Sequence, residues 1–107
     1  MKGTYLRFYV HETRKRHGEM LYDWLLKKAK ELGIHGGSAF RAIAGYGRHG
    51  IIHEQRFFEL VADLTVEVEF IVSDDEAERF LEIIRQEGIH IVYAKVPADF
   101  GVIDGVD

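Results

Sequence analysis

The chain has 107 residues, contains no cysteine and carries a formal net charge of −4 at pH 7. This length predicts one domain over residues 1–107, and the missing thiols exclude disulfides, thiolate catalysis and cysteine-type zinc sites. The acidic balance argues against nucleic-acid binding, and no apolar run approaches the roughly 20 residues of a transmembrane helix. We therefore expect a soluble, cytoplasmic protein.

The N-terminal part of the chain predicts a strand followed by a helix. Residues 4–11 alternate between apolar and polar side chains, which is the period of a strand with one buried face. The basic run Arg-Lys-Arg-His at residues 14–17 is expected to be a solvated surface segment. Apolar residues then recur at helical spacing from Met20 to Leu32, and Gly33 occupies the position of a left-handed C-terminal cap.

The middle of the chain predicts two further strands. The small and apolar residues 38–44 suit a second strand. Residues 56–60 and 64–72 form an extended region with an irregularity near residues 62–63. Every second side chain from Leu64 to Val72 is apolar, so this part predicts the third strand.

The segment between these strands is rich in glycine and positive charge. Gly45, Gly47 and Gly50 surround Arg48 and His49. Glycines let backbone N–H groups turn toward a ligand, and arginine supplies a fixed positive charge, so the segment is a candidate anion-binding loop. Strand-like residues follow it instead of a helix, which favours a loop between two strands over a Walker or dinucleotide-binding motif.

The C-terminal part predicts a helix and a fourth strand. Ser73, followed three residues later by Glu76, matches a capping box that begins the helix, and Gly88 ends it. Residues 89–96 then supply a strand that we expect to stop at Pro97. The remaining residues, 98–107, are expected to form a loose tail.

The predicted order is strand, helix, strand, strand, helix, strand. This order predicts an α+β fold of the ferredoxin-like βαββαβ type, with an antiparallel four-stranded sheet and two helices on one face. The other sheet face is then expected to expose Tyr5, Arg7, Tyr9, Arg41, Glu67 and Glu69. Such a face suits either water or a second subunit packed sheet to sheet. Arg41 is expected there to pair with Glu67 or Glu69, or to reach a ligand phosphate.

Several segments match the pattern of one family. They are FYVHE at residues 8–12, GEMLYDWLLKKAKELGIHGGSAFRAIAGYG at 18–47, IIH at 51–53 and, more weakly, LVADLTVEVEFIVSDDE at 60–76. The most specific combination is, in chain order, Leu21-Tyr22, Gly36-Gly37, Gly45-Tyr46-Gly47 and His53. Over nearly its whole length the chain resembles the DUF190 family, a branch of the PII-like signalling proteins in the nitrogen regulatory PII superfamily.

The resemblance implies a ferredoxin-like subunit in a homotrimer, with ligand clefts between subunits. It implies a non-enzymatic regulator without a covalent cofactor. In PII-type proteins a loop between strands two and three reaches a target protein, for example a membrane transporter. Adenine nucleotides bind at the base of this loop, which corresponds here to residues 46–55. Carried onto this chain, the ligand-binding residues are Gly45, Gly47, Arg48, His53 and Arg41.

The chain also departs from the PII pattern. It passes from Gln86-Glu87-Gly88 almost directly into Ile89, where PII proteins have a further phosphate-binding loop. This favours a nucleotide with few phosphates, or another small anion. Two alternatives remain open: a metal-binding trimer similar to the CutA proteins, using His49, His53 and His11, and a nucleotide hydrolase acting at the same cleft.

Overall fold

The computed structural model describes residues 1–46, 52–54 and 64–105. Its helices are α1 (Leu21–Glu31) and α2 (Asp74–Gln86). The strands of its main sheet are β1 (Lys2–His11), β4 (Ser38–Arg41), β7 (Thr65–Val72) and β8 (Val92–Asp99). Two short strand pairs complete it: β2 (Lys15–Arg16) with β3 (Glu19–Met20), and β5 (Ala44–Tyr46) with β6 (Ile52–Glu54).

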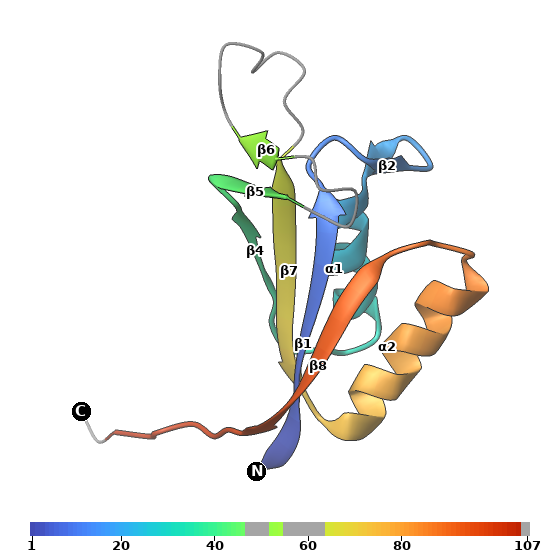
Figure 1. The fold of residues 1–107 in the computed structure, drawn as a ribbon. Coiled ribbons are helices and arrows are strands. Elements are labelled where there is room, and N and C mark those ends of the chain that lie inside the picture. Colours follow the sequence, from blue (N-terminus) through green and yellow to red (C-terminus); the bar gives the residue numbers. More distant parts are fainter. Residues whose placement is uncertain (47–51, 55–63, 106–107) are drawn as a thin grey trace.

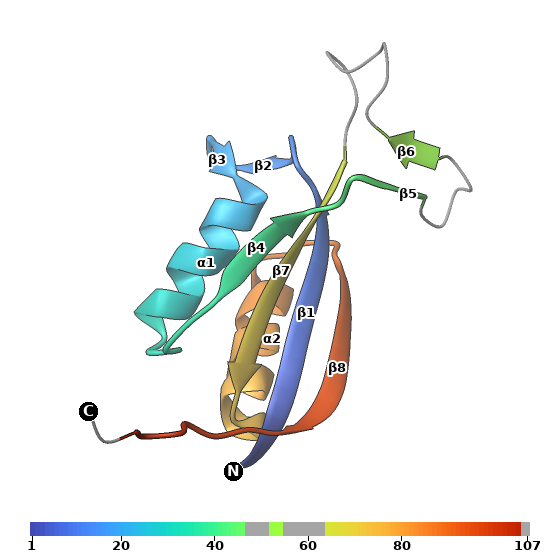
Figure 2. The ribbon, with the colours of Figure 1, turned by 90° about the vertical axis from the view of Figure 1, so that its left-hand side faces the viewer.

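The predicted ferredoxin-like fold is confirmed. The main sheet is four-stranded with the order β4-β7-β1-β8, and every neighbouring pair of strands is antiparallel. Both helices cover the same face of this sheet, and the opposite face is bare (Figure 1). Figure 2 looks onto the bare face and shows β1 and β7 at the centre of the sheet. We call this bare surface the open face.

The core lies between the sheet and the helices, as the alternation of β1 and β7 predicts. Leu6, Phe8, Val68 and Phe70 are at most 2 % exposed. Phe80 of α2 meets the rings of Phe8 and Phe70 edge to face, with ring centroids 5.5 and 5.3 Å apart. Edge-to-face contact places the positive ring edge against the negative ring face, which stabilises the cluster beyond area burial alone.

The two helices begin in different ways. The capping box of α2 is confirmed: Ser73 Oγ accepts from the Glu76 N–H at 3.1 Å, and the Ser73 N–H donates to Glu76 Oε1 at 2.9 Å. No side chain caps α1, whose first N–H, that of Leu21, instead donates to the Arg14 carbonyl at 2.7 Å. The start of α1 is therefore tied to the segment that follows β1.

The structure corrects two expected strand boundaries. β8 runs through Pro97 to Asp99, so the expected stop at Pro97 is wrong. β8 is an edge strand, where the missing N–H of proline leaves no ladder partner unsatisfied. The expected second strand, residues 38–44, is divided into β4 and β5. β5 pairs with β6, which lies inside the segment 46–55 that we expected to be a loop. The predicted extended residues 56–60 lie outside the described residues.

We expect Phe80→Ala to lower the free energy of unfolding by about 3–5 kcal/mol, because it removes a ring from the middle of the aromatic cluster. Urea unfolding followed by circular dichroism measures this loss. Glu82→Ala, on the exposed side of the same helix, is the control and should change stability by less than about 0.5 kcal/mol. Equal effects of the two substitutions would contradict the assignment of Phe80 to the core.

Candidate ligand site

A hollow opens beside β4, close to where the chain leaves the main sheet for the glycine-rich segment. Its volume is about 380 Å³. Its walls come from the end of β1, the β3–α1 junction, β4 and β7. They are formed by Glu12, Thr13, Met20, Tyr22, Ala39, Arg41 and Val66. We call this the β4 hollow.

An ion pair provides the charge in the β4 hollow. Arg41 donates from Nε to Glu12 Oε2 at 2.5 Å and from an Nη nitrogen to Glu12 Oε1 at 3.2 Å. The Glu12 N–H in turn donates to the Leu64 carbonyl at 2.8 Å, which fixes the backbone of the acidic partner. The Arg41 side chain is half-exposed and Glu12 is partly buried. This two-point geometry matches what a guanidinium offers to any carboxylate or phosphate.

The ion pair also shifts the acidity of both groups. The hydrogen bond from Arg41 lowers the pKa of Glu12 below its usual value, and the hydrogen bond to Glu12 raises the pKa of Arg41. Both groups are therefore charged at neutral pH, and the pair carries no net charge. A ligand anion that reaches Arg41 must compete with Glu12.

The position of Arg41 differs from the sequence expectation. Arg41 lies opposite Val66 in the β4–β7 register, and opposite residues of an antiparallel pair point to the same face. Val66 is 5 % exposed and belongs to the helix-covered face, so Arg41 lies on that side and not on the open face. Its expected pairing with Glu67 or Glu69 is wrong, because the register places Phe40 opposite Glu67.

The other predicted ligand residues fall in and beyond the β5–β6 pair. Gly45 lies in β5 opposite His53 of β6, and a Cβ atom added at Gly45 would meet open space. Gly45 does not line the β4 hollow. Gly47 and Arg48 lie outside the described residues. The structure thus brings Arg41 into a hollow and leaves the remaining four predicted contacts untested.

Sequence reasoning missed most of the walls of the β4 hollow. Met20 belongs to the amphipathic pattern of the predicted helix, Tyr22 enters only through the Leu21-Tyr22 motif of the resemblance, and Thr13 is not singled out. Glu12 enters the sequence analysis only within the FYVHE segment and not as the partner of Arg41. The Leu21-Tyr22 pair in the resemblance was the one available signal, because the walls come from segments distant in sequence.

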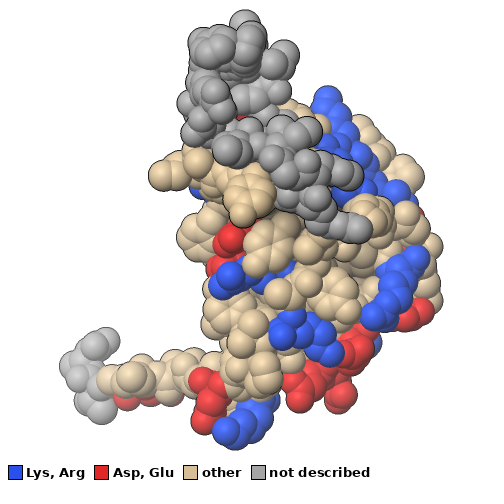
Figure 3. Space-filling view, viewed as in Figure 1, with Lys and Arg blue, Asp and Glu red and all other residues tan. Residues whose placement is uncertain are grey.

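The basic run at residues 14–17 forms the β2–β3 hairpin and is not simply solvated. His17 and Gly18 form its two-residue turn, with φ values of 51° and 82°, as a type I′ turn requires. Arg14 donates to the His90 carbonyl at 2.5 Å, and Arg16 donates to the Glu87 carbonyl at 2.6 Å. These bonds hold the hairpin against the end of α2, and Figure 3 shows its basic side chains gathered above that helix.

The described residues contain no group of three or more histidine and acidic side chains suited to hold a metal ion. His49 lies outside the described residues, so the metal alternative is not tested by this result. No helix in ranges 1–46, 52–54 and 64–105 is long and apolar enough to cross a membrane.

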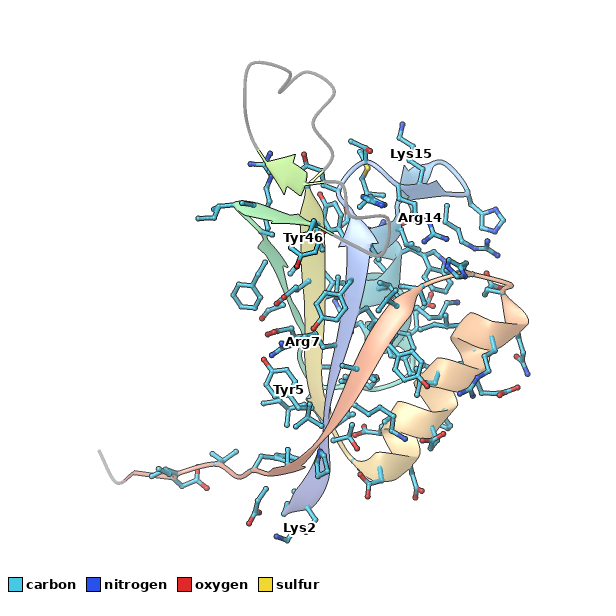
Figure 4. All side chains as sticks on the ribbon, viewed as in Figure 1. Lys2, Tyr5, Arg7, Arg14, Lys15 and Tyr46 are labelled. Carbon is cyan, nitrogen blue, oxygen red and sulfur yellow. The ribbon has the colours of Figure 1, made fainter. Side chains whose placement is uncertain are left out.

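The open face carries a network of charged and aromatic side chains. The Tyr5 hydroxyl donates to Glu69, with its oxygen 2.5 and 2.8 Å from the two carboxylate oxygens, and Arg7 Nε lies 3.4 Å from Glu69 Oε2. The Arg7 guanidinium also lies 5.0 Å from the centre of the Tyr5 ring, and Figure 4 shows both side chains on the uncovered side of the sheet. Hydrogen bonds with Tyr9 and Tyr5 raise the pKa of Arg7.

Apolar side chains surround this network. Phe40, Ile71, Val92 and Val96 are between 47 and 54 % exposed on the same face. An apolar rim around a paired Arg7 and Glu69 is typical of a surface that another protein covers. The sequence predicted the polar members of the open face, apart from Arg41, but not this rim.

The fold places the chain among proteins with the PII-like subunit architecture. The structure of CPII from Thiomonas intermedia K12 bound to ADP and bicarbonate is similar, with a TM-score of 0.66, 18% identity and coverage of 95% of this chain and 91% of that one. A second CPII structure, bound to ADP, AMP and bicarbonate, also has a TM-score of 0.66, with 20% identity and the same 95% and 91% coverage.

Sequence comparison gives the family directly. A model of DUF190, described as Uncharacterized ACR, matches residues 3–95. A UPF0166 protein of Aquifex aeolicus (strain VF5) is 36% identical over 101 residues, which cover 87% of this chain and 96% of that protein. A UPF0166 protein of Methanocaldococcus jannaschii is 31% identical over 96 residues, covering 86% and 88% of the two chains. The chain belongs to the DUF190 family.

The Arg41–Glu12 ion pair predicts how the stability of the fold depends on pH and what sets the pKa of Glu12. Because the pKa of folded Glu12 is lowered from 4.5, the pair stabilises the fold fully above pH 4.5 and loses this contribution as the pH falls through the lower folded value. We expect Arg41→Ala to raise the pKa of Glu12 toward its ordinary value, measured by NMR titration of the side-chain carboxyl carbon. Arg85→Ala, which removes the partner of Glu82, should leave it unchanged. An unaltered Glu12 titration in Arg41→Ala would contradict the pairing.

Proposed function

We propose that this protein is a non-enzymatic, PII-like regulator that binds a small anionic ligand, an adenine nucleotide, at clefts between the subunits of a homotrimer. One observation carries the proposal. Arg41, a half-exposed arginine, lies in the β4 hollow, four residues before Gly45 at the start of the glycine-rich segment. Family membership and the fold shared with CPII, whose structures hold ADP, support the choice of ligand class.

The β4 hollow offers complementary walls for such a ligand. Tyr22, Met20 and Val66 provide aromatic and apolar surface, which suits a flat base, while Arg41 provides two parallel N–H donors for a phosphate oxygen pair. Arg48 in the adjoining segment would add a second cation. Because Glu12 already engages Arg41, ligand binding exchanges one anion for another, which favours ligands of modest charge over a triphosphate.

The open face supports the assembly part of the proposal. Arg7 and Glu69 are paired within one subunit and the apolar rim is exposed, so burial of this pair and rim against another copy costs less desolvation than burial of unpaired charges, and it removes apolar area from water. In a homotrimer, one wall of each ligand cleft then comes from a neighbouring subunit.

The regulatory part of the proposal concerns the segment 46–55. It begins in β5, where the Tyr46 side chain is 74 % exposed. A ligand held at its base would order this segment and thereby change the contact that it makes with a target protein, through a disorder-to-order change. In this proposal the protein acts in the cytoplasm, and a membrane transporter is one class of target that it would contact there.

Calorimetry with ADP tests the role of the ion pair. We expect Arg41→Ala to weaken ADP binding about ten- to one hundredfold, because a charge-assisted hydrogen bond is lost. Glu12→Gln should instead tighten ADP binding by about two- to fivefold, since it removes the competing anion and keeps the side-chain shape. Weaker binding in both variants would show that the pair acts as a structural unit, and unchanged binding in both would remove the β4 hollow from the site.

A second experiment separates binding from assembly. We expect Arg48→Ala to weaken ADP binding while leaving the trimer mass unchanged in native mass spectrometry, because the proposal gives Arg48 a contact with the ligand and no part in the contacts between subunits. After incubation of the wild-type protein with ADP, the nucleotide that is recovered should still be ADP, without AMP or free phosphate. Conversion of the nucleotide would contradict the non-enzymatic part of the proposal.

A further inference from the structure

The last described residues leave the body of the protein as an extended tail. Residues 100–105 follow β8 and carry two adjacent apolar side chains, Val102 and Ile103, which are 84 and 98 % exposed. Within the described ranges, no hydrogen bond joins the backbone of residues 101–105 to the rest of the chain. Burial of these two branched apolar side chains against a partner would be favourable, because it removes their surface from water.

The start of this tail is held firmly. The Phe100 N–H donates to the Met1 carbonyl at 2.9 Å, and the amino group of Met1 donates to the Phe100 carbonyl at 2.9 Å. The Phe100 ring also packs over Gly3, where an added Cβ atom would lie 2.5 Å from the ring. Because both its backbone and its ring are fixed, Phe100 sets the direction in which residues 101–105 leave the sheet.

That direction is toward the open face. Figure 1 shows the tail leaving the sheet on the side opposite the helices, and Figure 2 shows it crossing the lower end of the sheet on the same uncovered side. A second copy seated on the open face would occupy the space beside this tail. The tail and the apolar rim therefore lie on the same side of the sheet, where one neighbouring copy would contact both.

We propose that residues 101–105 dock on the open face of a second copy of this chain, with Val102 and Ile103 buried against its apolar rim. This inference rests on the assembly part of the proposed function. The rim supplies the matching surface: Ile71 is 51 % exposed and lies at the same end of the sheet as the tail, since Tyr5 is opposite both Ile71 and Val96. An exchanged tail of this kind would link each subunit to its neighbour through a contact separate from the sheet packing.

The assembly equilibrium of the full chain tests the proposal. The variant Val102→Asp/Ile103→Asp places two charges where apolar burial is required. The matched control Gly101→Asp/Gly105→Asp adds the same two charges to the same tail and keeps both apolar side chains. Sedimentation velocity over a dilution series measures the protein concentration at which the oligomer dissociates.

We expect the first variant to dissociate at a concentration at least about tenfold higher than the wild type, and the control to dissociate within about threefold of it. Circular dichroism spectra at a concentration where all three proteins are assembled should be the same, because the tail makes no contact with the core of its own subunit. Equal weakening by both variants, or none in the first, overturns tail docking while leaving the assembly itself standing. A wild type that is monomeric at every concentration overturns the assembly part of the proposed function as well.

Disulfide cross-linking locates the docking surface. Because the chain contains no cysteine, only the introduced cysteines can form a disulfide. We expect Ile103→Cys co-expressed with Ile71→Cys to form a mixed disulfide under mild oxidation, identified by tandem mass spectrometry of the disulfide-linked peptides that contain residues 71 and 103. Ile103→Cys co-expressed with Glu82→Cys, on the helix-covered side, is the control and should form none. A mixed disulfide with Glu82→Cys and not with Ile71→Cys overturns the assignment to the open face.

Discussion

The two-sided alternation of the central strands is the constraint on which the rest of this structure depends. β1 pairs with both β7 and β8, so each of its side chains is committed to one face across three strands. Leu6 and Phe8 face the helices, while Tyr5 and Arg7 face outward. A shift of one residue would bury Arg7 under the helices and expose Phe8 to water, which makes any other register strongly unfavourable.

Because of this constraint, the two faces of the sheet have different roles. The helix-covered side supplies the stability, and the open face is left available for a second protein. The candidate ligand site lies at the ends of β1 and β4, beside the start of α1. There the end of β1 provides Glu12 and the end of β4 provides Arg41, from positions 29 residues apart in sequence. A site at the end of strands is held in place by the sheet while its walls stay open to a ligand.

The β2–β3 hairpin and the short α2–β8 connection explain how this chain differs from the expected PII pattern. Two arginines of the hairpin donate to backbone carbonyls at the end of α2 and just beyond it. Cations are favourable at this end of a helix, because the unpaired carbonyls there carry partial negative charge. The space beside that turn is therefore occupied by the chain's own basic residues. In the proposed function, the phosphate contacts of the ligand therefore come from the β4 side.

The sequence by itself determined the ferredoxin-like order, the core-facing residues of β1 and β7 and the capping box at Ser73, because these follow from short-range periodicity and local hydrogen bonding. It also indicated the family, through motifs spread over nearly the whole chain. Tertiary structure alone decided the partner of Arg41 and the walls of the β4 hollow. It also decided the docking of the basic hairpin and the continuation of β8 through Pro97. Each of these depends on register, or on which distant segments the sheet brings together, and local sequence carries no record of either.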